Sequence, residues 1–204
     1  MSKLLLVVVL LFGLSAAQES LPQADTAAAF DPNRTVLVFL SQRFFSEEAV
    51  GGLRAGLKEF GLATKTVARD TGLCISMDMT VLRPDFVLAD VRVEDFRALA
   101  LADGSGAILY WADTLLHALC RRFIAACKPV ASVGVANVVL ARAGLLKGKK
   151  ATILAERNAV AELKAAGATY VANPVVTDGL LLTAADSENS EELGKVLGHK
   201  LGGR

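Results

Sequence analysis

The sequence has few of the residues that bind metals or staple small folds. Its 204 residues include only three cysteines and two histidines. An odd number of cysteines leaves at least one thiol unpaired within an exported molecule, which excludes a disulfide scaffold. His117 and His199 each lack a second ligand at metal spacing, so we interpret them as surface or helix-end residues. The sequence therefore predicts neither a metal nor a cofactor.

The chain also lacks an excess of charge of either sign. It carries 22 basic and 21 acidic residues, for a formal net charge of +1. Removal of an N-terminal segment that contains Lys3 would leave the two signs equal in number. Because binding to nucleic acid depends on an excess of positive charge, we expect no nucleic-acid partner.

No apolar run in the sequence is long enough to span a bilayer. The longest N-terminal run, residues 4–14, has 11 residues, whereas a membrane-spanning helix needs about 20. Lys3 precedes it and Ser15-Ala16-Ala17 follows it, which is the pattern of a signal peptide over residues 1–17. We therefore predict export, to the medium or the periplasm, and no stable membrane insertion after cleavage.

A polar segment separates this start from the folded part of the chain. Residues 18–34 are rich in alanine, contain Pro22 and Pro32, and show no hydrophobic period, so we predict a flexible leader. The remaining residues, 35–204, have the size and the apolar content of one folded domain.

Apolar strands alternate with amphipathic helices along this domain. Thr35–Leu40 is a continuous apolar run, as in a parallel strand covered on both faces. Ser46 can cap a helix whose apolar residues recur at helical spacing as far as Gly61. Asp178-Gly179 indicates a hairpin turn. Further strands are predicted at 98–101, 130–133, 150–154, 169–171, 175–177 and 180–183, and helices at 114–127, 137–143, 156–166 and, weakly, after 186.

This alternation predicts an α/β fold with a largely parallel sheet between two layers of helices. In such sheets, ligands bind beyond the carboxyl ends of the strands. The site should therefore be sought in the loops that follow the strands.

Four segments in order resemble the PfpI family, whose superfamily includes intracellular proteases and the Parkinson-disease deglycase. The segments are Lys128–Val133, Val139–Thr152, Leu163–Val171 and Pro174–Leu180. The resemblance covers about residues 35 to 185. It implies a flavodoxin-like three-layer sandwich of the class I glutamine amidotransferase-like type, often as a homodimer, and we expect a homodimer here.

Catalytic members of that family carry a cysteine on a sharp strand-to-helix elbow, followed by histidine. Where the family reads alanine-isoleucine-cysteine-histidine-glycine-proline, this sequence reads Ser132–Asn137, which places Gly134 and Val135 at the cysteine and histidine positions. Neither side chain can act as a nucleophile or carry a proton. Glycine does suit a strained elbow, so the turn can persist without its chemistry. The family's glutamate corresponds to Ala49 in an ungapped count, or to Glu48 after a one-residue shift.

The other chemically active residues have ordinary structural explanations as well as functional ones. Cys120 and Cys127 fall on one helical stripe with Leu116 and Phe123, which favours small core residues over reactive thiols. Cys74 lies among apolar residues, where the sequence does not separate a buried thiol from a redox-active one.

The turn Asp103-Gly104-Ser105-Gly106 follows a predicted strand and offers two alternatives. Its backbone N–H groups could hold an anion, or it could be a turn and nothing more. Tyr110-Trp111, just beyond, either pack against the core or line the same crevice.

Together these features predict an exported, non-catalytic PfpI-like domain that binds a small-molecule ligand or works as a dimeric structural module. The candidate ligand-binding residues are Glu48, Gly104, Gly134 and Val135. One alternative is a lyase, hydratase, isomerase or hydrolase that uses Glu48 without a covalent intermediate. A second alternative is thiol redox sensing through Cys74.

Overall fold

The computed structural model describes residues 30–155 and 157–202. The predicted signal peptide, residues 1–17, and the first 12 residues of the predicted leader, 18–29, lie outside these ranges. Within the described residues, no helix has both the length and the apolar character needed to cross a membrane.

Seven strands form the central sheet, in the order β11-β12-β8-β7-β1-β3-β6. All neighbouring pairs are parallel except β11 and β12, which form an antiparallel hairpin. The predicted α/β class with a mostly parallel sheet is confirmed. The strands are β1 (Thr35–Phe39), β3 (Ala63–Ala68), β6 (Phe86–Val87), β7 (Ala98–Leu101), β8 (Val130–Val133), β11 (Val175–Asp178) and β12 (Leu181–Ala184).

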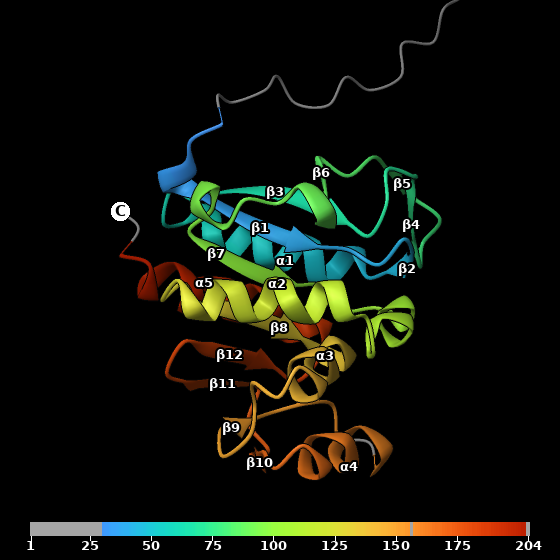
Figure 1. The fold of residues 1–204 in the computed structure, drawn as a ribbon, viewed down its shortest axis with the longest axis vertical. Coiled ribbons are helices and arrows are strands. Elements are labelled where there is room, and N and C mark those ends of the chain that lie inside the picture. The colour runs from blue at the N-terminus through green and yellow to red at the C-terminus, as the bar shows by residue number, and fades with distance from the viewer. Residues whose placement is uncertain (1–29, 156, 203–204) are drawn as a thin grey trace, which may run out of the picture. The chain divides into compact units, whose positions relative to one another are not determined.

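Helices cover both faces of this sheet, because successive strand residues point to opposite sides. In β1, Val36 and Val38 pack against helices α1 (Glu47–Lys58) and α5 (Ser190–Lys200). Leu37 and Phe39 pack on the other side, against α2 (Thr114–Ala125) and α3 (Asn137–Arg142). Figure 1 shows α2 on the near face and α1 on the far face. The predicted three-layer sandwich is therefore confirmed.

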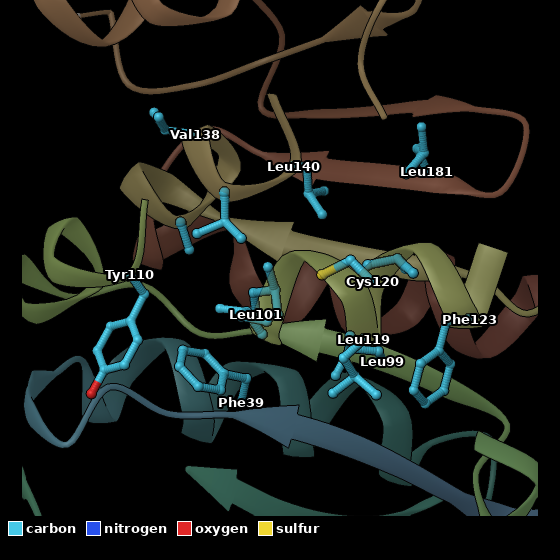
Figure 2. Close-up of a cluster of buried hydrophobic side chains, with 14 of the residues drawn as sticks. Phe39, Leu99, Leu101, Tyr110, Leu119, Cys120, Phe123, Val138, Leu140 and Leu181 are labelled. Carbon is cyan, nitrogen blue, oxygen red and sulfur yellow. The ribbon is translucent and has the colours of Figure 1, made fainter. Parts of the chain in front are cut away.

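The core beneath α2 is made of large side chains. Figure 2 shows Leu119, Cys120 and Phe123 of α2 facing Phe39 and Leu99 from the sheet. All five are nearly inaccessible to solvent. Burial of this size supplies most of the free energy that holds the helix on the sheet.

The opposite layer depends instead on a close approach of α1 and α5. A Cβ atom on Gly56 would overlap the backbone carbonyl of Glu191, and one on Gly52 would overlap the side chain of Ser190. The Ser190 hydroxyl donates to the carbonyl of Glu48 (3.2 Å). This contact fixes the first turn of α1 beside the first turn of α5.

Smaller elements surround this core. One small sheet contains β2 (Arg43–Phe45), β4 (Cys74–Ser76) and β5 (Val81–Leu82), and another contains β9 (Lys150–Ala151) and β10 (Thr169–Tyr170). Helix α4 spans Arg157–Ala165. Short 3-10 helices cover Pro32–Arg34, Leu88–Asp90, Val93–Asp95, Ser105–Tyr110, Gly134–Ala136 and Ser187–Asn189.

The predicted strand over residues 150–154 is wrong in extent. Only Lys150–Ala151 are extended in a ladder, and they pair with β10 outside the central sheet. Side chains take the hydrogen bonds that a longer ladder would use. The Asp178 carboxylate accepts from Lys150 N (2.9 Å), and the Thr183 hydroxyl accepts from Thr152 N (3.0 Å).

Strand β3 has no counterpart among the predicted elements. Its first residues, Ala63–Thr66, are mostly polar, and only the end of the strand is apolar and buried. A pattern based on apolar runs misses such a strand, although it pairs with β1 from Ala63 to Val67.

The predicted common stripe of Cys120 and Cys127 is also wrong. Helix α2 ends at Ala125, and Cys127 lies beyond it, exposed and with φ of 56°. Lys128 N donates to Phe123 O (2.9 Å) and Cys127 N donates to Ile124 O (3.0 Å). These two bonds form a Schellman cap, in which the residue with positive φ is usually glycine.

His117 is not the surface residue that the sequence suggested. It is buried within α2, and its Nε2 atom lies 3.1 Å from the carbonyl oxygen of Trp111. Burial lowers the pKa of His117. His199, in contrast, lies in the exposed last turn of α5, as predicted.

Candidate functional site

The elbow after β8 has the strained backbone that the sequence indicated. Gly134 follows the last residue of β8 with φ of 56°, in the left-handed region. A single 3-10 turn then leads into α3 at Asn137. Only glycine adopts this conformation without steric cost, so the local sequence and the local backbone agree.

The carboxylate of Asp103 occupies the space above this elbow. A Cβ atom added at Gly134 would lie less than 3.0 Å from three side-chain atoms of Asp103. Asp103 follows β7, the neighbour of β8 in the sheet, by two residues. The position from which a nucleophilic side chain would project is therefore filled by an acid from the adjacent strand.

Hydrogen bonds hold Asp103 in this position. Its Oδ1 atom accepts from Val135 N (2.9 Å), and its Oδ2 atom accepts from the Ser187 hydroxyl (3.1 Å). The Ser187 and Ser46 hydroxyls are also 2.9 Å apart. Ser46 caps α1 by accepting from Ala49 N (3.1 Å). Four loops at the carboxyl edge of the sheet thus meet at one carboxylate.

Burial raises the pKa of Asp103. Hydrogen bonds from the backbone of Gly104 and Val135 and from Ser187 oppose this shift, and the nearby carboxylate of Asp186 reinforces it. The Ser187 hydroxyl, which is linked to that of Ser46, can form a hydrogen bond with Asp103 in both its ionised and its protonated state. Each hydroxyl can reverse the direction in which it donates, so the network stays satisfied when Asp103 is protonated.

Asn137 ties the elbow to the strand ends beyond it. Its side chain is fully buried, and Nδ2 donates to the carbonyls of Thr152 and Ala184, each at 2.8 Å. Within the described part of the chain, Asn137 Oδ1 and Thr152 Oγ1 have no hydrogen-bond partner. The region on this side of the elbow is therefore polar and incompletely satisfied.

The structure brings together three of the four predicted ligand-binding residues. Gly104, Gly134 and Val135 all contact or flank Asp103. Glu48 is exposed on α1, and the next residue, Ala49, is the buried one. A ligand at these four residues stays a prediction.

The glycine-rich turn at residues 103–106 is a close backbone crossing. A Cβ atom on Gly104 would overlap the carbonyl of Phe44, and one on Gly106 would overlap the carbonyl of Arg43. Gly104 also has φ of 132°. These glycines are thus explained by the packing of two chain segments, without any anion.

The two aromatic residues beyond that turn support the core and the elbow. The Tyr110 hydroxyl accepts from Gln42 N (3.1 Å), and its ring packs edge-on against Phe39 (Figure 2). Trp111 Nε1 donates to the carbonyl of Val135 (2.9 Å), and Arg142 stacks over the indole. Trp111 therefore fixes the elbow backbone from the side opposite to the acid network.

None of the three thiols takes part in the hydrogen bonds that hold Asp103. All are free, and burial raises the pKa of Cys74 to about 11 and that of Cys120 to about 12. Cys127 precedes β8 and therefore lies toward the amino end of that strand, opposite the elbow. The functional group at the elbow is a carboxylate and not a thiol.

Sequence reasoning considered Asp103 only as the first residue of a turn. Its placement could have been anticipated from one signal, an acidic residue immediately after a buried strand whose neighbour ends at the elbow. Ser46 was expected only to cap a helix, and Ser187 lay in a tail with no assigned role.

Comparison with known proteins supports one family over nearly the whole described chain. Residues 34–199 match the model of the DJ-1/PfpI family. An uncharacterised protein of Methanocaldococcus jannaschii is 34% identical over 163 residues, which covers 79% of this chain and 80% of the relative.

Solved structures give the same fold. A ThiJ/PfpI domain protein from Brachyspira murdochii superposes with a TM-score of 0.79 at 22% identity, covering 83% of this chain and 96% of that one. Drosophila melanogaster DJ-1beta gives a TM-score of 0.72 at 23% identity, with 84% and 91% of the chains covered. The chain belongs to the DJ-1/PfpI family.

Proposed function

We propose that this chain is an exported, non-catalytic DJ-1/PfpI-family domain that binds a small molecule at the carboxyl edge of its sheet. The proposal combines an elbow without a nucleophile, a carboxylate that fills the vacated space, and thiols that are buried or remote. A homodimer, as the family resemblance implies, is compatible with this role.

The position of Asp103 is the observation that carries the proposal. A substrate carbonyl would have to approach residue 134, where Gly134 offers no reactive atom and the Asp103 side chain blocks the path. The Val135 N–H group, which could have faced a developing negative charge, already donates to Asp103. An occupied donor cannot stabilise an oxyanion unless Asp103 moves away.

The buried thiols add a second argument. A thiolate is the nucleophile and the target of mild oxidants, and burial keeps Cys74 and Cys120 protonated at neutral pH. Redox sensing through Cys74 is therefore disfavoured by its surroundings. Mass spectrometry after mild peroxide treatment tests it, and we expect Cys74 to remain unmodified.

The decisive experiment is a turnover assay on the purified chain that begins at Gln18. Methylglyoxal and short peptides serve as substrates, with a catalytically active family member as positive control. We expect rates equal to those of buffer alone. Thiol-dependent turnover that disappears after alkylation would refute the non-catalytic assignment.

A second candidate is acid–base chemistry without a covalent intermediate, with Asp103 in place of Glu48. The raised pKa of Asp103 favours it, because a carboxyl group shifted toward neutral pH can exchange protons with a ligand. If any turnover is found, Asp103→Asn should abolish it and Glu48→Gln should leave it unchanged. The opposite pattern would return the role to Glu48.

Export is tested independently of the chemistry. Expression of the full sequence in a bacterial host should place the protein in the periplasm or the medium, with Gln18 as the first residue in intact-mass measurement. Retention of residues 1–17 on a cytoplasmic product would contradict the predicted signal peptide.

A further inference from the structure

A pocket separate from the filled elbow opens at the same edge of the sheet. Its volume is about 270 Å³, and it lies between the segment that follows β9 and the turn that follows β12. Residues of these two segments, of β10 and of the stretch that follows β10 line it, among them Thr152, Leu154, Tyr170, Pro174, Asp186 and Asn189. This volume suits a molecule of a few heavy atoms rather than a drug-sized ligand.

The pocket carries a negative charge that the described residues do not neutralise. Asp186 lines it, and Oδ1 of this residue accepts from Asn189 N (3.2 Å) and from the Asn189 side chain. Over residues 30–155 and 157–202, Asp186 forms no ion pair with a lysine, arginine or histidine. The carboxylate of Asp186 lies near enough to Asp103 to add, by repulsion, to the rise that burial causes in the pKa of Asp103. A cation would relieve this repulsion.

The pocket wall also contains a hydroxyl without a partner. Thr152 is 1% exposed, and its Oγ1 atom makes no hydrogen bond within the described residues. The backbone of Thr152 is fully engaged, through Thr183 Oγ1 and Asn137 Nδ2. An unpartnered buried hydroxyl is unfavourable, so this part of the pocket wall is polar and unsatisfied within the described residues.

Apart from the amides of Asn173 and Asn189, much of the remaining wall is apolar. Leu154, Pro174 and the ring of Tyr170 line the pocket, and Leu154 is 38% exposed, which is unusual for a leucine in a packed domain. An aliphatic chain placed there would remove this surface from water. A charged group at one side and an apolar surface at the other define an amphipathic ligand.

We infer that the pocket binds a small organic cation, an alkylammonium whose ammonium group pairs with Asp186 and whose alkyl chain packs against Leu154. This inference rests on the proposed binding role and assigns a ligand class to it. It needs no reaction at Gly134.

Isothermal titration calorimetry with the full chain tests the ligand class. The titrants are the chlorides of ammonium, ethylammonium and n-butylammonium at constant ionic strength, with n-butanol and sodium butyrate as matched neutral and anionic probes. We expect affinity to rise from ammonium to n-butylammonium. We also expect n-butanol and butyrate to bind at least about tenfold more weakly than n-butylammonium, because each lacks the ion pair.

Two variants with the same change of charge test the site. Asp186→Asn keeps an oxygen that can accept from Asn189 N but removes the charge, and it should weaken n-butylammonium binding about tenfold. Glu188→Gln, on an exposed residue of the same turn that does not line the pocket, should bind as the unmodified chain does. Titration of n-butylammonium at two salt concentrations should give a lower affinity at the higher concentration, because salt screens the ion pair.

The outcomes separate this inference from the broader proposal. Equal binding of butyrate and n-butylammonium, or equal effects of the two variants, would overturn the cation assignment. Absence of binding by all five probes would also overturn it. None of these results bears on turnover, so the non-catalytic proposal would stand or fall on its own assay.

Discussion

Two neighbouring regions at the carboxyl edge of the sheet differ in what fills them. At the elbow, Asp103 occupies the space above Gly134 and is held there by Val135 and Ser187. Beside it, the pocket lined by Asp186 remains open, with a volume of about 270 Å³. The chain itself thus satisfies the polar groups at the first region and leaves those at the second available. The open space at this edge of the sheet therefore lies beside the elbow and not above Gly134.

Restoring a thiol at the elbow should have the largest effect. Gly134→Cys forces a non-glycine residue into the left-handed region and drives its Cβ atom into Asp103. We expect a loss of about 3 to 5 kcal/mol in the free energy of unfolding, measured by urea denaturation. Turnover of methylglyoxal should not appear.

Gly144→Ala is the matched control for this substitution. Gly144 also has positive φ, 77°, but nothing lies near the position of an added Cβ atom. It should lose only about 1 to 2 kcal/mol, the backbone part of the penalty. Equal losses for the two variants would show that Asp103 does not crowd the elbow.

Asn137 separates the two regions, and its removal should have the next largest effect. Asn137→Ala leaves the carbonyls of Thr152 and Ala184 without their donor and creates a cavity. We expect a loss of about 3 kcal/mol in the free energy of unfolding. Asn173→Ala, on an exposed residue of the pocket rim, should change it by less than about 0.5 kcal/mol.

Replacement of Thr152, the residue with the unpartnered hydroxyl in the pocket wall, should change the free energy of unfolding by less and in the opposite direction. Thr152→Val removes a buried group that has no hydrogen bond to any residue that the structure describes, so stability should stay equal or rise by about 1 kcal/mol. Thr183→Val removes an acceptor that is used by Thr152 N and should lose about 1 to 2 kcal/mol. Thermal unfolding of both, without ligand, makes the comparison. A marked loss in Thr152→Val would mean that its hydroxyl is already satisfied.

The smallest expected effect is the change with pH in the free energy of unfolding that the titration of Asp103 causes. Because the pKa of Asp103 is raised on folding, the folded state binds more protons, and the free energy of unfolding falls as pH rises from the ordinary carboxyl range through the raised pKa. Asp103→Asn removes this term. Its stability relative to the unmodified chain should therefore improve as pH is raised from about 3.5 to 6 in urea titrations.

Asp178→Asn should show the reverse. Hydrogen bonds from Lys150 N and Lys149 lower the pKa of Asp178, so its contribution appears as pH rises and is lost as pH falls. The variant should lose stability relative to the unmodified chain as pH is raised from below the ordinary carboxyl pKa of 3.8 through that value. Curves of the same sign for both variants would show that the environment of Asp103 is misassigned.

The fold could be predicted in large part because its strands are apolar and its helices are capped. The runs at 35–40, 98–101 and 130–133 became β1, β7 and β8 with boundaries shifted by at most one residue. The strand at Lys150 is shorter than predicted, because the backbone N–H groups of Lys150 and Thr152 donate to the side chains of Asp178 and Thr183. Such bonds leave no periodic trace in the sequence.

The sequence predicted which side chains are missing from the elbow, but not which residues fill it. Gly134 and Val135 identified the elbow, but the residue that fills it comes from another strand, and its partner Ser187 lies 84 residues further along the chain. Glu48 was selected by position in a helix, and the helix turns that side chain to solvent. Contacts between loops depend on the register of whole strands, which one sequence does not reveal.

The glycine contact between α1 and α5 joins the first helix of the domain to its last one, so it can form only late in synthesis. Ser190 reaches Glu48 across 142 residues, and α5 covers the helix that begins the sandwich. A ribosome therefore has to synthesise residue 190 and those after it before the glycine surface of α1 can be covered. Until then the growing chain leaves the surface of α1 around Gly52 and Gly56 uncovered.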